Sequence, residues 1–403
     1  MTPTAATMQG TSVPAATDGR TVNFRKLNTL EVILKITERC NLNCDYCYFF
    51  NAGDDSYKGH SALISNDTVA LLMQRLKEFS EEYELQRIAI HLHGGEPLLM
   101  PKARLDRICE EIRSTLDSVV DVSMTIQTNG MLVDLEWIEI FNRHRIQVGV
   151  SLDGAKVHND AHRLDHNGRS SYQATVRGLA LCREHLDQPP AVLAVIGEDF
   201  DAGEIYDHFR RDLHVRQLDF LLPDLNHDNF SGDAEAYGDF LIQVFDRMAN
   251  DEESVGVRFV DHFLARIYGQ GNFLFGDGSD DPDHLLITVS SDGGVGPDDT
   301  LRSTKYWNGY DYRDLKSASI GEIIQDPLFH EFEYFKKTPA SACSECCWRD
   351  VCRSGQPVHR YGSSKGFDNP TVYCEGLDKF YTHVVRHLAL HGEPLEKVGA
   401  DLI

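Results

Sequence analysis

Three cysteines lie close together in TERCNLNCDYCYFF, residues 37–50, separated by three and then two residues. They are Cys40, Cys44 and Cys47. Thiolates hold iron–sulfur clusters, and a cluster of four irons bound by only three protein thiolates keeps one iron open for another ligand. A structural zinc site is the alternative, but zinc ribbons pair two short cysteine spacings and close all four metal positions. The lone triplet therefore favours an iron–sulfur cluster with one open iron.

Five of the remaining cysteines crowd into one later stretch of the chain. They are Cys343, Cys346, Cys347, Cys352 and Cys374. In a reducing compartment, cysteines at such density are more often metal ligands or redox groups than disulfide partners. The other two cysteines, Cys109 and Cys182, stand alone in helix-like sequence. There we expect them to pack in the core, as a lone buried thiol usually does.

The charge of the chain limits its partners. Its 403 residues include 63 acidic and 39 basic side chains, which gives a formal net charge of −24. Such a field repels phosphate backbones and anionic lipid surfaces, so we expect no nucleic-acid partner and no membrane partner. No apolar run approaches the ~20 residues of a membrane-spanning helix, and no basic and then apolar secretion pattern opens the chain. We therefore expect a cytoplasmic protein.

Short β-branched runs alternate with helical patterns over the first half of the chain. The strand-like runs cover residues 30–37, 87–94, 120–130, 145–154, 189–197 and 218–223. The helical patterns between them include residues 67–83, 103–118 and 170–186. Strand and helix in alternation indicate βα units on a parallel sheet. Six such units predict an α/β fold, a partial (β/α)6 barrel whose site lies at the C-terminal ends of the strands.

The pattern divides the chain into four expected segments. Residues 1–28 are rich in Thr, Ala and Pro without apolar periodicity, which favours a disordered or loosely docked arm. Residues 29–225 would form the partial barrel, and residues 226–285 a helical connection. Residues 286–403 would form a cysteine-rich extension that ends in a helix.

The cysteine triplet, with Tyr46 before its last cysteine and a strand-like run before its first, is similar to the signature of the radical S-adenosylmethionine (SAM) superfamily. HGGEPLL, IQTNG and VSLDG, which end the second, third and fourth runs, resemble further motifs of that superfamily, and so does HNDAHRLDHNGRSSY. The resemblance implies that the triplet holds a 4Fe-4S cluster and that SAM chelates its open iron. One electron would then split SAM into methionine and a 5'-deoxyadenosyl radical.

The resemblance also implies a set of contacts to SAM. Glu96 and the backbone of its turn would hold the amino group, polar groups at the next strand ends would contact ribose and methionine, and Val195 would pack on adenine. Arg163 would pair with the carboxylate, as an arginine fork can, although a surface ion pair with Asp160 or Asp165 is its alternative. The implied cofactor-binding residues are Tyr46, Gly94, Gly95, Glu96, Pro97, Thr125, Gln127, Asn129, Ser151, Asp153, Arg163 and Val195. Each of these turn motifs alone would more often be an ordinary turn.

The later cysteine group resembles the SPASM extension of radical SAM peptide-modifying enzymes, which usually holds two auxiliary clusters. This chain departs from that pattern: Gln356 and Asp298 stand in place of cysteines, and residues 285–302 contain none. The resemblance therefore implies a single auxiliary 4Fe-4S cluster, with Cys347 left over as buried filler or an alternative ligand. The implied ligands are Cys343, Cys346, Cys352 and Cys374.

The tail HRYGSSKGFDNPTVYCEGL resembles the end of the peptide maturases that form three-residue cyclophanes, the Xye, Grr and Fxs groups. The resemblance implies a precursor peptide as substrate, removal of a β-hydrogen, and a carbon–carbon cross-link to an aromatic ring. An external electron donor of flavodoxin or ferredoxin type would be needed. Other radical SAM/SPASM activities, namely thioether formation, epimerisation or sulfatase maturation, remain open, as does the more distant option of a non-enzymatic zinc or electron-transfer protein.

Such a reaction also needs a group that takes a proton from the substrate. Asp299 matches the base position of sulfatase-maturing relatives, and Asp298 is the second choice. Carboxylates in a desolvated site can take protons near neutral pH. The alternative is structural, because DGG and PDD are also good turn sequences.

Overall fold

The computed structural model describes residues 22–253, 255–268, 284–307 and 313–392. The expected N-terminal arm therefore lies outside the described residues up to residue 21. Its last part is ordered. Phe24, in a short 3-10 helix at Phe24–Lys26, and Leu27 are both buried in the core, and the Phe24 ring lies 5.0 Å from the ring of His330.

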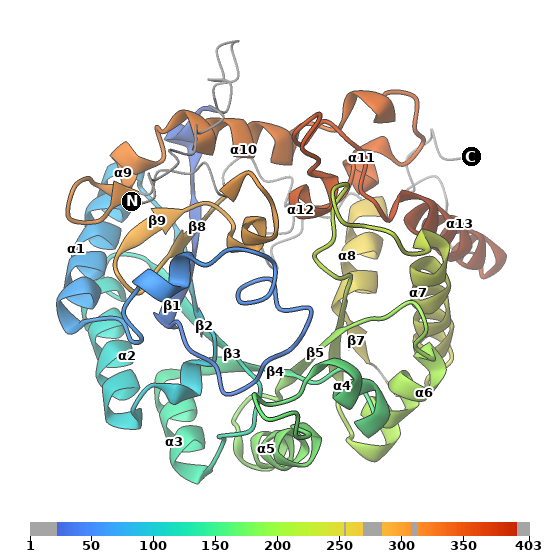
Figure 1. The fold of residues 1–403 in the computed structure, drawn as a ribbon, viewed down its shortest axis with the longest axis horizontal. Helices are drawn as coiled ribbons and strands as arrows, with labels where there is room; N and C mark the ends of the chain where they lie inside the picture. Colours follow the sequence, from blue (N-terminus) through green and yellow to red (C-terminus); the bar gives the residue numbers. More distant parts are fainter. Residues whose placement is uncertain (1–21, 254, 269–283, 308–312, 393–403) are drawn as a thin grey trace, which may run out of the picture.

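Within the described residues, ten strands form one central sheet, in the order β10-β9-β8-β1-β2-β3-β4-β5-β6-β7. The strands from β8 to β7 are parallel, and β9 and β10 continue the sheet in antiparallel fashion. The bounds are β1 (Thr29–Thr37), β2 (Arg87–Gly94), β3 (Asp121–Thr128), β4 (Ile146–Ser151), β5 (Ala191–Val195), β6 (Gln217–Leu221), β7 (Gly256–Val257), β8 (His284–Val289), β9 (Gly294–Gly296) and β10 (Arg313–Asp314). The sheet curves into an open barrel with helices around its outside (Figure 1).

The helices of the barrel follow its strands in turn. They are α1 (Asn66–Tyr83), α2 (Lys102–Leu116), α3 (Leu135–His144), α4 (Lys156–His162), α5 (Tyr172–His185), α6 (Ala202–Asp207), α7 (Ala234–Ala249) and α8 (Arg258–Ile267). Several begin at a capping side chain: Ser65 accepts from the Thr68 amide, and Asp134 from the Trp137 amide. Apolar side chains of β1, such as Val32 and Leu34, are fully buried. The α/β fold expected from the sequence is confirmed.

Two parallel strands extend the six that the sequence indicates. β7 has only two residues, too few for a periodic pattern. β8 lies directly beside β1, with Thr29 paired to His284. The expected boundary at residue 286 therefore falls inside a strand of the barrel sheet.

The C-terminal region consists of short helices and one long one. They are α9 (Ile320–Ile323), α10 (Pro327–Lys337), α11 (Arg349–Cys352), α12 (Pro357–Arg360) and α13 (Cys374–Leu390). Helix α13 packs on α7, where a side chain on Gly376 would overlap the carbonyl oxygen of Ala234. This close approach of two backbones fixes Cys374, the first residue of α13, beside the barrel.

Candidate active site

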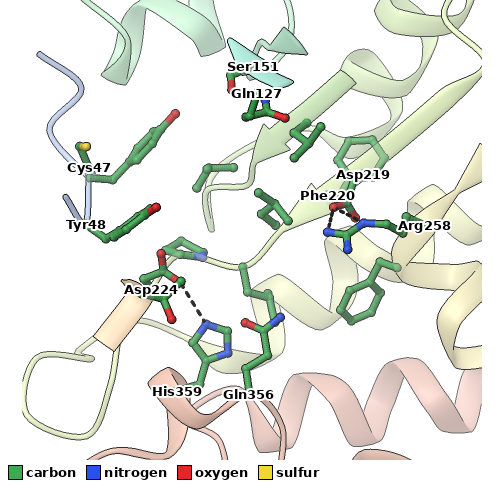
Figure 2. A pocket seen from close by; sticks show the side chains of 18 of the residues that line it. Cys47, Tyr48, Gln127, Ser151, Asp219, Phe220, Asp224, Arg258, Gln356 and His359 are labelled. Carbon is green, nitrogen blue, oxygen red and sulfur yellow. Dashed lines mark hydrogen bonds and ion pairs between the residues drawn. The ribbon is translucent and has the colours of Figure 1, made fainter. Parts of the chain in front are cut away.

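A cavity of about 420 Å³ lies at the C-terminal ends of the parallel strands. Cys40, Cys44 and Cys47, in the loop after β1, line it, and so does Cys352 at the end of α11. Figure 2 shows Gln127 and Ser151 on one side of this cavity and Gln356 and His359 on the opposite side. The cysteine triplet therefore shares one cavity with a member of the second cysteine group.

The thiols of the triplet fit a cationic iron–sulfur cluster. All three are partly buried, and burial raises the pKa of Cys40 to about 12 and that of Cys44 to about 11. Without a cation these thiols would stay protonated, whereas bound metal ions deprotonate coordinating thiols. Within the described residues, no three His, Cys, Asp or Glu side chains converge on the position of a single ion. A cluster of several irons is larger than one ion, so its thiols need not converge on a point.

The Gly-Gly-Glu turn after β2 packs directly on the backbone of the cysteine loop. Gly94 has φ +150°, and a side chain there would overlap the Thr37 carbonyl oxygen. A side chain on Gly95 would overlap the Arg39 carbonyl oxygen. Only glycine allows this approach, which holds the two loops against each other.

Glu96 joins that turn to β3. It is 1% exposed, and its carboxylate accepts from the Thr128 hydroxyl (2.7 Å) and from the Asn129 amide (2.7 Å). It also accepts from the Leu98 amide at 3.0 Å. Burial raises its pKa despite these hydrogen bonds. Pro97 begins the short 3-10 helix Pro97–Leu99 behind it and does not line the cavity.

Tyr46, Asp153 and Arg163 form a hydrogen-bonded network, and Tyr46 and Arg163 line the cavity. The Tyr46 hydroxyl donates to Asp153 at 2.6 Å and accepts from Arg163 at 2.7 Å. Asp153 also accepts from the Val195 amide at 3.1 Å. The buried Nε of Arg163 has no hydrogen-bond partner among the described residues. A carboxylate or another acceptor in the cavity would satisfy it.

The alternative reading of Arg163 as a surface ion pair does not match the structure. Asp160 pairs with Lys156, and Asp165 pairs with Arg169 at 2.7 Å. Arg163 itself is 8% exposed and lines the cavity.

Of the residues predicted at the strand ends, some line the cavity and one does not. Gln127, Asn129, Ser151 and Val195 line the cavity, and Gln127 donates to Ser151 at 2.7 Å. Thr125, two residues earlier on β3, is not among the lining residues, and its hydroxyl lies 2.8 Å from His91 Nδ1. The structure therefore separates Thr125 from the other expected contacts.

Asp299 lies in the interior, where it forms an ion pair with Lys35 and accepts from the Tyr48 hydroxyl at 2.9 Å. Burial acts to raise the pKa of Asp299, but Lys35, His93 and Arg302 together outweigh it and lower that pKa. Asp298 accepts from the amide and the hydroxyl of Thr300, and burial raises its pKa. Neither aspartate is among the residues that line the cavity.

Sequence reasoning missed a carboxylate that does line the cavity. Asp224 follows β6, and burial beside Asp298 and Asp299 raises its pKa to about 8. His359 Nε2 lies 4.0 Å from Asp224 Oδ1 (Figure 2). Its position in the sequence could have indicated it, because Asp224 directly follows the last strand-like run, and other predicted site residues also lie at the ends of such runs.

The four expected auxiliary ligands come together at the start of α13. The nearby thiols of Cys343 and Cys346 act electrostatically on Cys374, and those of Cys374 and Cys343 act on Cys352. The hydroxyl of Ser354 donates to Cys343 Sγ at 3.2 Å. Cys347 is exposed. The arrangement fits a cluster on the four expected cysteines.

The chain turns sharply after Cys352. Arg353, Ser354 and Gly355 all have left-handed backbones, with φ of 51°, 71° and 79°. Consecutive left-handed residues are costly for side chains other than glycine, and such strain clusters at functional sites. The turn brings Gln356 to the wall of the cavity.

The profile of the radical SAM superfamily matches residues 34–210. This segment includes the cysteine triplet, the Gly-Gly-Glu-Pro turn and Arg163. The chain therefore contains a radical SAM domain over these residues. Enzymes of this superfamily use a 4Fe-4S cluster together with SAM.

Individual relatives extend the likeness over almost the whole chain. A cysteine-type anaerobic sulfatase-maturating enzyme of Clostridium novyi (strain NT) is 22% identical over 90% of this chain and 99% of its own length. A serine-type anaerobic sulfatase-maturating enzyme of Bacteroides thetaiotaomicron is 24% identical over 87% of each chain. The solved structure of native anSMEcpe with bound AdoMet superposes with a TM-score of 0.77 at 20% identity, over 90% of this chain and 98% of that one. The C-terminal cysteine-rich region is thus part of a fold shared with these structures.

None of the helices in the described part of the chain has the length and apolar content that a membrane span requires.

Proposed function

We propose that this enzyme modifies a peptide or protein side chain by removing a hydrogen atom, a proton and an electron. One observation carries the proposal: the cysteine triplet and Cys352 of the second cysteine group line the same cavity. A substrate side chain in that cavity would lie between the site of radical formation and an electron acceptor.

The cofactor contacts follow from the residues that line the cavity. Cys40, Cys44 and Cys47 would hold the 4Fe-4S cluster, and the free Nε of Arg163 would bind the carboxylate of SAM. When bound, the cluster and SAM supply the radical that removes a hydrogen atom. Gln127 and Ser151 present polar groups to the same space. Thr125 does not line the cavity and is therefore left out of the proposed cofactor contacts.

A second 4Fe-4S cluster would be held by Cys343, Cys346, Cys352 and Cys374. It would take the electron that leaves the substrate and pass it to an external one-electron carrier. An external electron donor of flavodoxin or ferredoxin type would reduce the SAM-binding cluster. Gln356 and Asp298, which stand at two cysteine positions of the SPASM pattern, cannot supply thiolates. We therefore propose two clusters in total.

The relatives support a peptide as the substrate. Two of the superposed structures are of anSMEcpe with bound AdoMet and a peptide, Kp18Cys or Cp18Cys, each with a TM-score of 0.75. The cavity of this chain lies at the C-terminal ends of its parallel strands. We propose that a segment of peptide enters it.

Two finer activities differ in what the substrate radical becomes. The tail GFDNPTVYC resembles cyclophane-forming maturases, which favours a cross-link between an aromatic ring and a β-carbon. The relatives named as sulfatase-maturating enzymes favour oxidation of a cysteine or serine side chain instead. Both use the same cavity and the same cofactors.

Anaerobic reconstitution with iron and sulfide, followed by reduction with SAM, tests the proposal. Candidate peptides are Cp18Cys, its serine counterpart, and peptides with an aromatic residue two positions before a polar one. We expect deuterium transfer from the peptide into 5'-deoxyadenosine and a changed peptide mass. An aldehyde that reacts with a hydrazide reagent would identify oxidation, whereas a mass loss of two hydrogens without an aldehyde would identify a cross-link. SAM cleavage with every peptide unchanged would refute the proposal.

A further inference from the structure

The site needs a proton acceptor, and the position of Asp299 argues against that residue. Its carboxylate is 1% exposed, is paired with the fully buried Lys35, and accepts from Tyr48. An ion-paired carboxylate with a lowered pKa is a weak base. It is also not among the groups that line the cavity.

Asp224 differs from Asp299 in its position, its exposure and its pairing. It lines the cavity at the end of β6, where catalytic groups of such barrels lie. Its side chain is 24% exposed, and in the described part of the chain it has no ion-pair partner, because the His359 ring 4.0 Å away is neutral. Figure 2 shows it between Tyr48 and His359. We propose that Asp224 is the group that accepts a proton from the bound substrate.

His359 provides an independent observation that points to this position. The ring is 3% exposed, and its Nε2 is buried without a hydrogen-bond partner in the described part of the chain. The ring also bonds the carbonyl oxygen of Pro223, so Nδ1 carries the hydrogen and Nε2 is left as an acceptor. The unpaired Nε2 faces the Asp224 carboxylate at 4.0 Å and supplies no proton to it.

The groups around Asp224 set when it can accept a proton. Burial, with the carboxylates of Asp298 and Asp299 nearby, raises its pKa to about 8. His359 stays neutral because burial lowers its pKa to about 3. The titratable groups that face or act on Asp224 are Asp298 and Asp299 after β9, Tyr48 in the cysteine loop, His359 on α12 and Tyr373 before α13.

The inference rests on the proposed function, and its step balances within it. A C–H bond of the substrate loses a hydrogen atom to the SAM-derived radical. An S–H, O–H or ring C–H bond of the same substrate loses its proton to Asp224. One electron leaves the substrate for the auxiliary cluster and then an external one-electron carrier. In all, the substrate loses two electrons and two protons.

The rate of peptide modification should therefore depend on pH in a particular way. Only the ionised carboxylate accepts a proton, so the rate should rise as the pH increases through about 8. If Asp299 were the base, its lowered pKa would leave the rate independent of pH in that range. SAM cleavage needs no proton acceptor and should not follow the same profile.

The test compares Asp224→Asn, Asp224→Glu, Asp299→Asn and Asp228→Asn in the holoenzyme with a peptide that the wild type modifies. Asp228 lies in the same loop, contacts Ser363 and does not line the cavity, so its variant is the matched control. We expect Asp224→Asn to slow peptide modification by about 10²-fold or more, in the range of a lost general base, while 5'-deoxyadenosine still forms. Asp224→Glu should restore part of the rate and its pH dependence.

The outcomes separate the two proposals. An unchanged rate and pH profile in Asp224→Asn, with loss of modification in Asp299→Asn, would overturn the role of Asp224 and leave the proposed function standing. Loss of both modification and SAM cleavage in Asp224→Asn, with normal iron content, would assign Asp224 to cofactor binding and overturn its role as base. Failure of the wild type to modify any peptide while it cleaves SAM would overturn both proposals.

Discussion

Lys35 on β1 and Asp299 after β9 form an ion pair in which neither side chain reaches solvent. The Tyr48 hydroxyl also donates to Asp299, and His93 Nδ1 lies 3.1 Å from Lys35 Nζ. The pair joins the strand that leads into the cysteine loop to the chain segment before the second cysteine group.

Removal of one partner of this pair should destabilise the fold strongly. Lys35→Met would take the ion-pair partner from the buried Asp299 carboxylate, which costs about 3–5 kcal/mol of unfolding free energy. The double variant Lys35→Met/Asp299→Asn should recover much of that loss because no unpaired charge remains. Urea unfolding of the three proteins measures both effects. Equal stability of Lys35→Met and the wild type would show that the pair has no structural role.

The glycines of the Gly-Gly-Glu turn should be intolerant of a side chain. In Gly95→Ala the added methyl group would push against the Arg39 carbonyl and the Phe50 ring. We expect the free energy of unfolding to fall by about 1–3 kcal/mol and SAM binding to weaken. Gly59→Ala is the control, because its side chain would meet nothing within 4 Å. Thermal unfolding and equilibrium binding of SAM report the two effects. A Gly95→Ala protein that matches Gly59→Ala in both would contradict the packing described for this turn.

The iron content should respond to the two cysteine groups separately. Two clusters predict about eight irons per chain after reconstitution, and loss of either group should leave about four. We expect Cys352→Ala to lose one cluster and to keep SAM cleavage, and Cys44→Ala to lose SAM cleavage. Cys347→Ala is the control, because Cys347 is exposed and lies outside the expected ligand set. Iron analysis and electron paramagnetic resonance measure these outcomes; a wild type with about twelve irons would refute the two-cluster proposal.

His60 should make stability depend on pH near neutrality. Its Nδ1 lies 2.7 Å from the buried carboxylate of Glu38, which raises the pKa of His60 above its ordinary value of about 6.5. A raised folded-state pKa means that the contribution is fully present below the ordinary value and is lost as the pH rises through the raised one. His60→Asn should remove this slope. Unfolding curves at several pH values test the prediction, and an identical slope in the variant would contradict it.

The sequence predicts the parts of the fold that local patterns encode. All six strand-like runs are strands, and the glycines of the Gly-Gly-Glu turn are required by the backbone contacts with Thr37 and Arg39. The sequence pattern did not predict β7, because two residues carry no periodicity. It did not predict β8 as a strand of the barrel sheet, because the pairing of β8 with β1 spans most of the chain.

Residues of the candidate site could be predicted where a motif sets both the residue type and its position at the end of a strand. Tyr46, Asp153 and Arg163 meet as one network, although no sequence pattern indicates that they contact one another. The environment of Asp299 was not predictable, because its partner Lys35 is distant in sequence and the ion pair exists only in the folded chain. Asp224 was missed because a single aspartate after a strand is also ordinary turn chemistry.

The place of β8 next to β1 has a consequence for how the protein folds. Until residues 284–289 have been synthesised, β1 has a bare edge on one side, and bare edges promote pairing with other chains. Contacts so distant in sequence also form slowly. The strand that carries the cysteine triplet is therefore completed late, so iron–sulfur cluster insertion into the mature site would follow synthesis of the C-terminal third. Chains truncated before residue 284 should aggregate.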